Sequence, residues 1–181
     1  MPWLEKERRA VRTIETTCCF TGHRPEKLPW RYDETDAGCV SLRHRIGTSV
    51  ENVYGQGYRY FLCGMAQGCD FLFCEEVLAL RERCPDVFLE AAIPCPSQAD
   101  TWSAAQRERY RRLTDACNLR TLVSQRYTPD CLLRRNRYMV DRSSLLISVY
   151  GGVPGGSQYT VAYAMRHGLQ ILSVPVLEPD R

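Results

Sequence analysis

The segment YRYFLC-GMAQGCD, residues 58–70, decides the fold, because an apolar strand-like run leads through a glycine turn into a helix-like run. The segment LLISVY-GGVPGGS, residues 145–157, has the same arrangement. Such a turn exposes backbone N–H groups at the positive end of a helix dipole, which suits a phosphate. Two such units in one short chain predict a nucleotide-type ligand, but they do not say what is done to it.

Strand-like and helix-like segments alternate along the whole chain. We expect strands at residues 16–21, 58–63, 87–93, 119–124, 145–150 and 171–174, and helices at residues 36–54, 70–83, 99–116, 130–142 and 157–167. Ser97 with Asp100 resembles a capping box, and Thr128-Pro129 is typical of a helix start. The alternation predicts an α/β fold: a Rossmann-like, doubly wound, mainly parallel sheet with helices on both faces. Ligands bind such sheets at the carboxyl ends of the strands, where the strand order reverses.

The length and composition of the chain limit the classes of function to consider. We expect residues 16–181 to form one domain and residues 1–15 to be an N-terminal arm outside the core. A net charge of +3 permits an anionic ligand but does not indicate a dedicated nucleic-acid binder. No apolar run approaches the roughly 20 residues of a membrane span. Several of the ten cysteines lie inside apolar runs and the amino terminus has no apolar signal-peptide core, so we expect a cytoplasmic protein with no disulfide scaffold. No Cys-x-x-Cys occurs and the chain has only three histidines, so we expect no metal site.

The turn after the first expected strand reads TGHRP, residues 21–25. Gly22 permits a close backbone approach, and Thr21 and Arg24 are suited to holding a phosphate or ribose. The alternative is an ordinary turn in which His23 is a surface or hydrogen-bonded residue. Its position as the first strand-to-helix turn of a doubly wound sheet favours the ligand site.

The turn at residues 64–70 is neither the dinucleotide fingerprint nor a P-loop, because its glycine spacing differs and it has no Walker lysine. Asp70 has two interpretations. It caps the following helix, or its carboxylate accepts hydrogen bonds from a ribose or a base. A carboxylate is a poor neighbour for a phosphate, so this turn is expected to face another part of the ligand.

The turn at residues 154–157 is the better phosphate site. Gly155 and Gly156 can present successive N–H groups as an anion nest, and the Ser157 and Thr160 hydroxyls lie near the helix start. The alternative is a plain glycine-rich connection with Ser157 as the N-cap.

The fourth expected helix contains RRNR, residues 134–137. Asn136 shares a face with Leu133 and Val140, so it is either satisfied inside the core or turned toward a site. We expect the arginines to be solvated helix surface.

Together these segments resemble the YpsA-like family of the SLOG superfamily, which includes DprA and the Lonely-guy phosphoribohydrolases. The resemblance is carried by TGHRP (21–25), GMAQGCD (64–70), RNRYMVD (135–141) and GGS (155–157) with TVAYA (160–164), and it covers residues 16–175. It implies a Rossmann-like sheet that binds nucleotides or derivatives such as ADP-ribose or NAD-like molecules. The expected ligand-binding residues are Thr21, Gly22, His23, Arg24, Gly64, Met65, Gln67, Gly68, Asp70, Asn136, Gly155, Gly156, Ser157 and Thr160.

One departure from the phosphoribohydrolases bears on activity. Their motif Pro-Gly-Gly-x-Gly-Thr is followed closely by a catalytic glutamate, whereas the run after Pro154 lacks the Gly-Thr pair and any glutamate before the helix ends. Asp70, Glu75 and Glu76 are the remaining catalytic candidates. We therefore expect a nucleotide-binding sensor or regulator that needs no cofactor.

Two other functions remain open at this stage. The first is a nucleotide N-glycosidase or phosphoribohydrolase, and the second, least favoured, is single-stranded DNA binding. A homodimer is the expected form if the chain self-associates, because symmetric pairs are the commonest assemblies.

Overall fold

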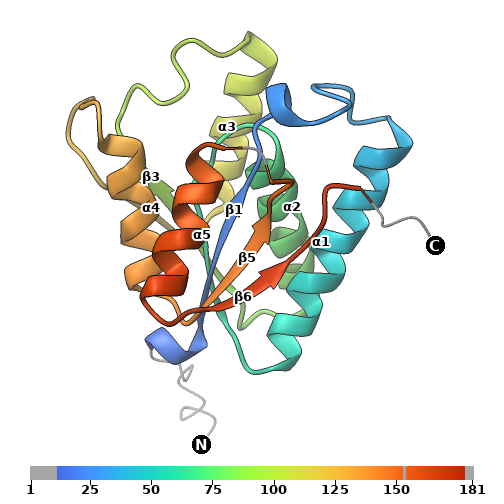
Figure 1. Ribbon diagram of the computed structural model, residues 1–181, viewed down its shortest axis with the longest axis vertical. Helices are drawn as coiled ribbons and strands as arrows, with labels where there is room; N and C mark the ends of the chain where they lie inside the picture. The colour runs from blue at the N-terminus through green and yellow to red at the C-terminus, as the bar shows by residue number, and fades with distance from the viewer. Residues whose placement is uncertain (1–11, 153, 178–181) are drawn as a thin grey trace, which may run out of the picture.

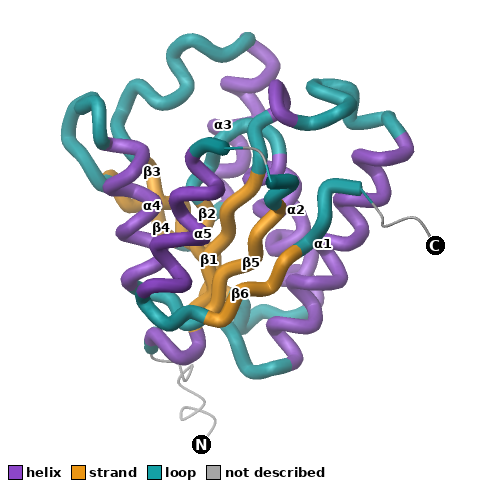
Figure 2. Tube along the Cα trace, viewed as in Figure 1, coloured by secondary structure: helices purple, strands orange, loops and turns teal. Residues whose placement is uncertain are grey.

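The computed structural model describes residues 12–152 and 154–177. Six parallel strands form one sheet in the order β4-β3-β2-β1-β5-β6 (Figures 1 and 2). The strands are β1 (Thr17–Gly22), β2 (Tyr60–Cys63), β3 (Phe88–Ile93), β4 (Leu119–Leu122), β5 (Leu145–Val149) and β6 (Gln170–Ser173). The chain runs outward from β1 to β4 and then returns to pair β5 with the other side of β1, so the strand order reverses between β1 and β5.

The helices cover both faces of the sheet (Figure 1). They are α1 (Ala37–Gly55), α2 (Cys69–Arg83), α3 (Ala104–Ala116), α4 (Cys131–Asp141) and α5 (Gly156–Arg166), with short 3-10 turns at Ile14–Thr16 and Pro25–Lys27. Helices α1, α2 and α3 pack side by side, and α4 packs against α5. This arrangement confirms the Rossmann-like, doubly wound α/β fold.

The central strands are buried on both sides, which explains why their sequences are continuously apolar. The larger core lies on the α1–α3 side and contains Phe20, Phe61 and Phe73, with the rings of Phe20 and Phe73 stacked 4.4 Å apart. The smaller core lies under α4 and α5 and contains Cys19, Leu62, Leu146 and other apolar side chains. All ten cysteines are free thiols.

Two expected helix starts are wrong. Helix α3 begins at Ala104, where the Ser103 hydroxyl accepts a hydrogen bond from the Gln106 N–H, so the cap lies six residues beyond the Ser97 motif. Helix α4 begins at Cys131 with Asp130 at the N-cap, which places Pro129 outside the helix. In both places several residues are able to cap a helix, and tertiary packing selects among them.

The expected arm, residues 1–15, lies largely outside the described residues. Of its described part, Arg12 forms an ion pair with the buried carboxylate of Glu90 in β3. A search of the described helices for one long and apolar enough to span a membrane finds none.

Candidate functional site

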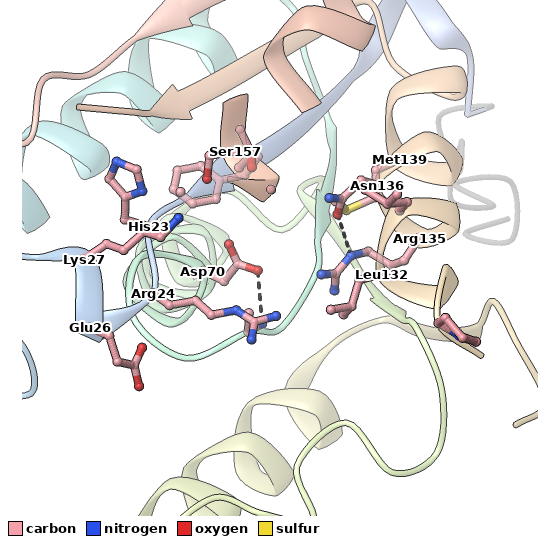
Figure 3. Close-up of a pocket in the computed structure, with 17 residues that line it drawn as sticks. His23, Arg24, Glu26, Lys27, Asp70, Leu132, Arg135, Asn136, Met139 and Ser157 are labelled. Carbon is pink, nitrogen blue, oxygen red and sulfur yellow. Dashed lines mark hydrogen bonds between the residues drawn. The ribbon is translucent and has the colours of Figure 1, made fainter. Parts of the chain in front are cut away.

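A cavity of about 450 Å³ lies at the carboxyl edge of the sheet, where the strand order reverses between β1 and β5 (Figure 3). Its lining comes from the end of β1 and the following turn, the start of α2, helix α4 and the first residues of α5. The lining residues are Phe20, Thr21, Gly22, His23, Arg24, Glu26, Lys27, Ala66, Asp70, Pro129, Leu132, Leu133, Arg135, Asn136, Met139, Gly156 and Ser157.

Two glycines allow the turn after β1 to approach helix α2 closely. A Cβ at Gly22 would lie 2.5 Å from the Cβ of Cys69, so a side chain does not fit there. Gly68 has φ = +85° and its position faces the carbonyl oxygen of His23, which accepts a hydrogen bond from the Cys69 N–H at 3.1 Å. Close packing of these two turns brings Arg24 and Asp70 to the same cavity.

His23 ties the first turn to the glycine turn after β5. Its imidazole is 3% exposed, and its Nε2 accepts a hydrogen bond from the Gly151 N–H at 2.9 Å. An accepting Nε2 requires the neutral ring, with its proton on Nδ1. Burial and then the nearby positive charge of Lys27 lower the pKa of His23 below its usual value. His23 is thus the hydrogen-bonded residue that one interpretation of this turn predicted, although it also lines the cavity.

Asp70 presents a buried carboxylate to the cavity. Its side chain is 6% exposed, and one carboxylate oxygen accepts a hydrogen bond from the Ala66 N–H at 3.0 Å. Burial raises the pKa of Asp70, and the nearby charge of Arg135 opposes that shift in part. The interpretation of Asp70 as a helix cap is wrong, because α2 begins at Cys69 with Gly68 at the N-cap.

Helix α4 contributes Arg135 and Asn136. Arg135 is 4% exposed, and its guanidinium donates to the carbonyl oxygen of Gly64 and, from Nε at 2.8 Å, to the Asn136 amide oxygen. Desolvation lowers the pKa of Arg135 from its usual value. The expectation that the arginines of this helix are all solvated surface is therefore wrong for Arg135, because α4 turns this residue inward over the sheet.

The start of α5 forms the remaining wall. Gly155 is the N-cap with φ = +150°, so the interpretation of Ser157 as the N-cap is wrong. The Lys27 ammonium donates a hydrogen bond to the carbonyl oxygen of Pro154 at 2.7 Å. A cation therefore stands beside the first N–H groups of a helix, and Gly156 and Ser157 both line the cavity there.

Comparison with known proteins assigns this chain to a family. The family model YpsA, described as the YspA SLOG family, matches residues 18–173. The chain belongs to this YpsA family.

Its relatives include a UPF0398 protein from Bacillus cereus (strain G9842), 25% identical over 154 residues and covering 82% of each chain. Another is the uncharacterized SPbeta prophage-derived protein YoqJ from Bacillus subtilis (strain 168), 26% identical over 140 residues, with 70% of this chain and 82% of YoqJ covered.

The solved structures that resemble this YpsA-family chain include two DNA processing proteins A. The protein from Helicobacter pylori gives a TM-score of 0.60 at 16% identity, covering 93% of this chain and 67% of that one. The protein from Streptococcus pneumoniae gives a TM-score of 0.58 at 16% identity, covering 89% of this chain and 50% of that one. At this identity the likeness establishes a shared fold.

The residues expected at the ligand site of this YpsA-family protein fall into two groups. Those that line the cavity are Thr21, Gly22, His23, Arg24, Asp70, Asn136, Gly156 and Ser157. Those outside its lining are Gly64, Met65, Gln67, Gly68, Gly155 and Thr160. Gly64, in the second group, supports the lining, because it leaves room for Arg135, whose nearest guanidinium atom would lie 2.5 Å from a Cβ there. The Thr160 hydroxyl is buried and donates to the Gly156 carbonyl oxygen at 2.9 Å.

Glu75 and Glu76, two of the catalytic candidates, lie away from this cavity. Glu75 forms ion pairs with Arg109 at 2.9 Å and Arg43 at 2.9 Å, and Glu76 pairs with Arg43 at 2.8 Å. The structure therefore gives both carboxylates partners that join α2 to α1 and α3. In the described ranges 12–152 and 154–177, no group of three or more His, Cys, Asp or Glu side chains is placed to hold a metal.

The expected site omitted several lining residues of this YpsA-family cavity. Lys27 and Glu26 follow the TGHRP motif in a 3-10 turn, which returns both side chains to the cavity. Arg135 opens the segment RNRYMVD, residues 135–141, in which the charge of the side chain predicts exposed surface. The apolar lining residues, such as Leu132 and Met139, carried no sequence signal that separates a cavity wall from core.

Proposed function

We propose that this protein binds a nucleotide or a nucleotide-derived ligand, of the ADP-ribose or NAD-like class, and acts as a sensor or regulator. One observation carries the proposal. At the point where the strand order reverses, Arg24 and Lys27 share a cavity with the amino end of α5 and with the buried carboxylate of Asp70. Cations beside a helix amino end favour an anion, and a nearby carboxylate favours hydroxyl or amine donors.

The cavity thus has two chemically different ends. Near Gly156 and Ser157, backbone N–H groups and the Lys27 ammonium suit a phosphate. At Asp70 and Asn136, side-chain oxygens suit ribose hydroxyls or the amino edge of a base. A volume of about 450 Å³ lies within the range of small-ligand sites, which is about 300–1,000 Å³.

The placement of the candidate catalytic carboxylates favours a protein that binds its ligand without converting it over one that catalyses a reaction. The glutamate of the phosphoribohydrolase motif is missing after Gly156, and Glu75 and Glu76 are committed to ion pairs. One observation favours the enzyme alternative, a nucleotide N-glycosidase or phosphoribohydrolase. Asp70 is buried in the cavity and its pKa is raised, as suits a general acid.

A thermal-shift screen against AMP, ADP, ADP-ribose and NAD, with chromatographic analysis of each stabilising compound, tests the proposal. We expect at least one compound to raise the melting temperature and to be recovered intact. Arg24→Ala should remove most of that shift, whereas Arg126→Ala, a change of an exposed arginine outside the cavity, should preserve it. Release of free base that Asp70→Asn abolishes would establish the enzyme alternative, and flat melting curves with all four compounds would refute both.

Single-stranded DNA belongs in the same screen, because the Helicobacter pylori DNA processing protein A is described by its single-stranded DNA binding mode. The present chain shares the fold at 16% identity and carries a net charge of +3. We expect no filter retention of an oligodeoxynucleotide at low salt. Retention that falls steeply with added salt would replace the nucleotide proposal with a nucleic-acid one.

A further inference from the structure

A second cavity, of about 640 Å³, adjoins the first. It lies between the segment after β1, the turn after β2 and the start of α3, and its lining residues are Arg24, Glu26, Tyr32, Gln67, Thr101, Trp102, Ser103 and Gln106. Arg24 and Glu26 line both cavities. Gln67, which the sequence predicted at the ligand site, lines this second cavity and not the first.

Two aromatic side chains give the second cavity its character. Trp102 is held edge-to-face against Phe71 and Tyr110, with interplanar angles of 80° and 88°, so its indole has a fixed orientation. Tyr32 is 51% exposed, and its hydroxyl donates a hydrogen bond to Glu26 at 2.5 Å. Rings with fixed positions favour a planar partner, because little side-chain entropy is lost on stacking.

The remaining lining groups are neutral hydrogen-bonding side chains, namely those of Gln67, Thr101, Ser103 and Gln106. An amide both donates and accepts, as does a hydroxyl, so the set can pair with the edge of a heterocycle. Such a lining differs from that of the first cavity, where charged groups dominate the polar contacts.

Arg24 stands where the two cavities meet. Its side chain is exposed, and in the part of the chain that the structure describes no ion pair within 4.0 Å involves its guanidinium. Its charge acts on the nearby carboxylates of Glu26 and Asp70 and favours the ionised form of each. Figure 3 shows it extending past Asp70 from the turn after β1. A guanidinium has five N–H donors and can bind two phosphate oxygens at once.

We propose that the second cavity holds the distal planar group of a two-part ligand whose bridging phosphates bind Arg24 together with the Lys27 ammonium and the start of α5. This inference rests on the proposed function, and within the class named there it selects pyrophosphate-bridged dinucleotides, whose distal part is planar, over ADP-ribose and mononucleotides. One nucleoside lies in the first cavity beside Asp70. The other planar group lies in the second cavity with Tyr32 and Trp102.

Calorimetric titration with AMP and with NAD tests this assignment. The wild-type protein should bind NAD at least tenfold more tightly than AMP. Gln106→Trp fills the second cavity and should bring the affinity for NAD down to that for AMP, while the affinity for AMP changes less than twofold. Glu108→Trp is the matched control on the same helix, because Glu108 has a side chain 61% exposed outside both cavities and should leave both affinities unchanged.

Tyr32→Ala provides a second test that does not depend on filling the cavity. Loss of one stacking ring should weaken NAD binding about tenfold and leave AMP binding unchanged, and Tyr32→Phe should retain full NAD affinity. Equal affinities for AMP and NAD in the wild-type protein, or an equal loss of both affinities in Gln106→Trp, would refute the proposal that the second cavity binds part of the ligand. The proposal that the protein binds a nucleotide would still stand. Absence of binding by either compound would refute the nucleotide proposal itself, and with it this one.

Discussion

Replacing Gly68 by alanine should destabilise the protein substantially, because this residue combines a backbone conformation that side chains avoid with a close contact. At φ = +85° and ψ = −126° an L-residue costs about 1–3 kcal/mol. A Cβ there would lie 2.8 Å from the carbonyl oxygen of His23 and 2.9 Å from Cδ of Pro25. If the turn moves away to relieve this contact, the hydrogen bond from Cys69 to His23 weakens, at a cost of about 1 kcal/mol.

We therefore expect Gly68→Ala to lower the free energy of unfolding by about 2–4 kcal/mol, the conformational cost and the hydrogen bond taken together. Gly57→Ala is the control. Gly57 also has positive φ, +102°, but no atom lies within 4 Å of a Cβ built there. Gly57→Ala therefore loses only the free energy of the unfavourable backbone conformation. The difference in unfolding free energy between the two variants measures the contact between the turns.

Urea denaturation followed by tryptophan fluorescence measures both variants at the same pH. Because the contact positions the segment that carries Arg24, the Gly68 variant should also lose the thermal shift produced by whichever nucleotide stabilises the wild-type protein. A Gly68→Ala variant no less stable than Gly57→Ala would refute the reasoning that close packing of these two turns builds the cavity.

Two further predictions concern titratable groups. Asp70→Asn should raise the free energy of unfolding at neutral pH, because burial raises the pKa of this carboxyl and its ionised form is disfavoured in the fold. The amide oxygen can still accept the hydrogen bond from the Ala66 N–H. A variant that urea denaturation shows to be less stable than the wild-type protein would contradict this prediction. The pKa of His23 is lowered, so the unfolded chain binds the proton more readily. Stability should therefore be complete above about pH 6.5 and decline as the pH falls below it, and an equally steep decline in His23→Gln would exclude His23 as the cause.

The alternation of strands and helices was predictable from the sequence because it depends on local patterns. Segments such as 60–63 are apolar without interruption, as a strand covered on both faces requires, and the glycine turns that follow β2 and β5 mark the carboxyl edge. The start of α3 was not predictable, because Ser97 and Ser103 are both able to cap a helix. Only the tertiary path from β3 to α3 decides between them.

The residues of the candidate site were predictable where the order of strands and turns places them. They were not predictable where the orientation of a helix determines which side chains face the cavity. Thr21 and Gly22 end β1, His23 and Arg24 follow it, and Gly156-Ser157 open the helix after β5. The fold class alone therefore places all of them at the carboxyl edge of the sheet. Arg135 lies on the buried face of α4 with Cys131 and Met139, four residues before and after it, but a charged residue within a run of arginines favoured solvated surface. Its burial follows from the rotation of α4 about its own axis, which many weak packing contacts determine together.

The buried charges of Asp70 and Arg135 bear on the proposed ligand. Burial raises the pKa of Asp70 and lowers that of Arg135, so for each group desolvation outweighs the attraction of the other charge. No ion pair within 4.0 Å joins them in the described structure, and each is satisfied mainly by backbone or amide groups. A buried pair of this kind stabilises a fold less than apolar side chains of similar size would. Arg135 serves the fold itself, because its guanidinium donates to the carbonyl oxygens of Gly64 and Ala92. The charge that the fold does not use is that of Asp70, and our proposal assigns it to the donor groups of a bound molecule.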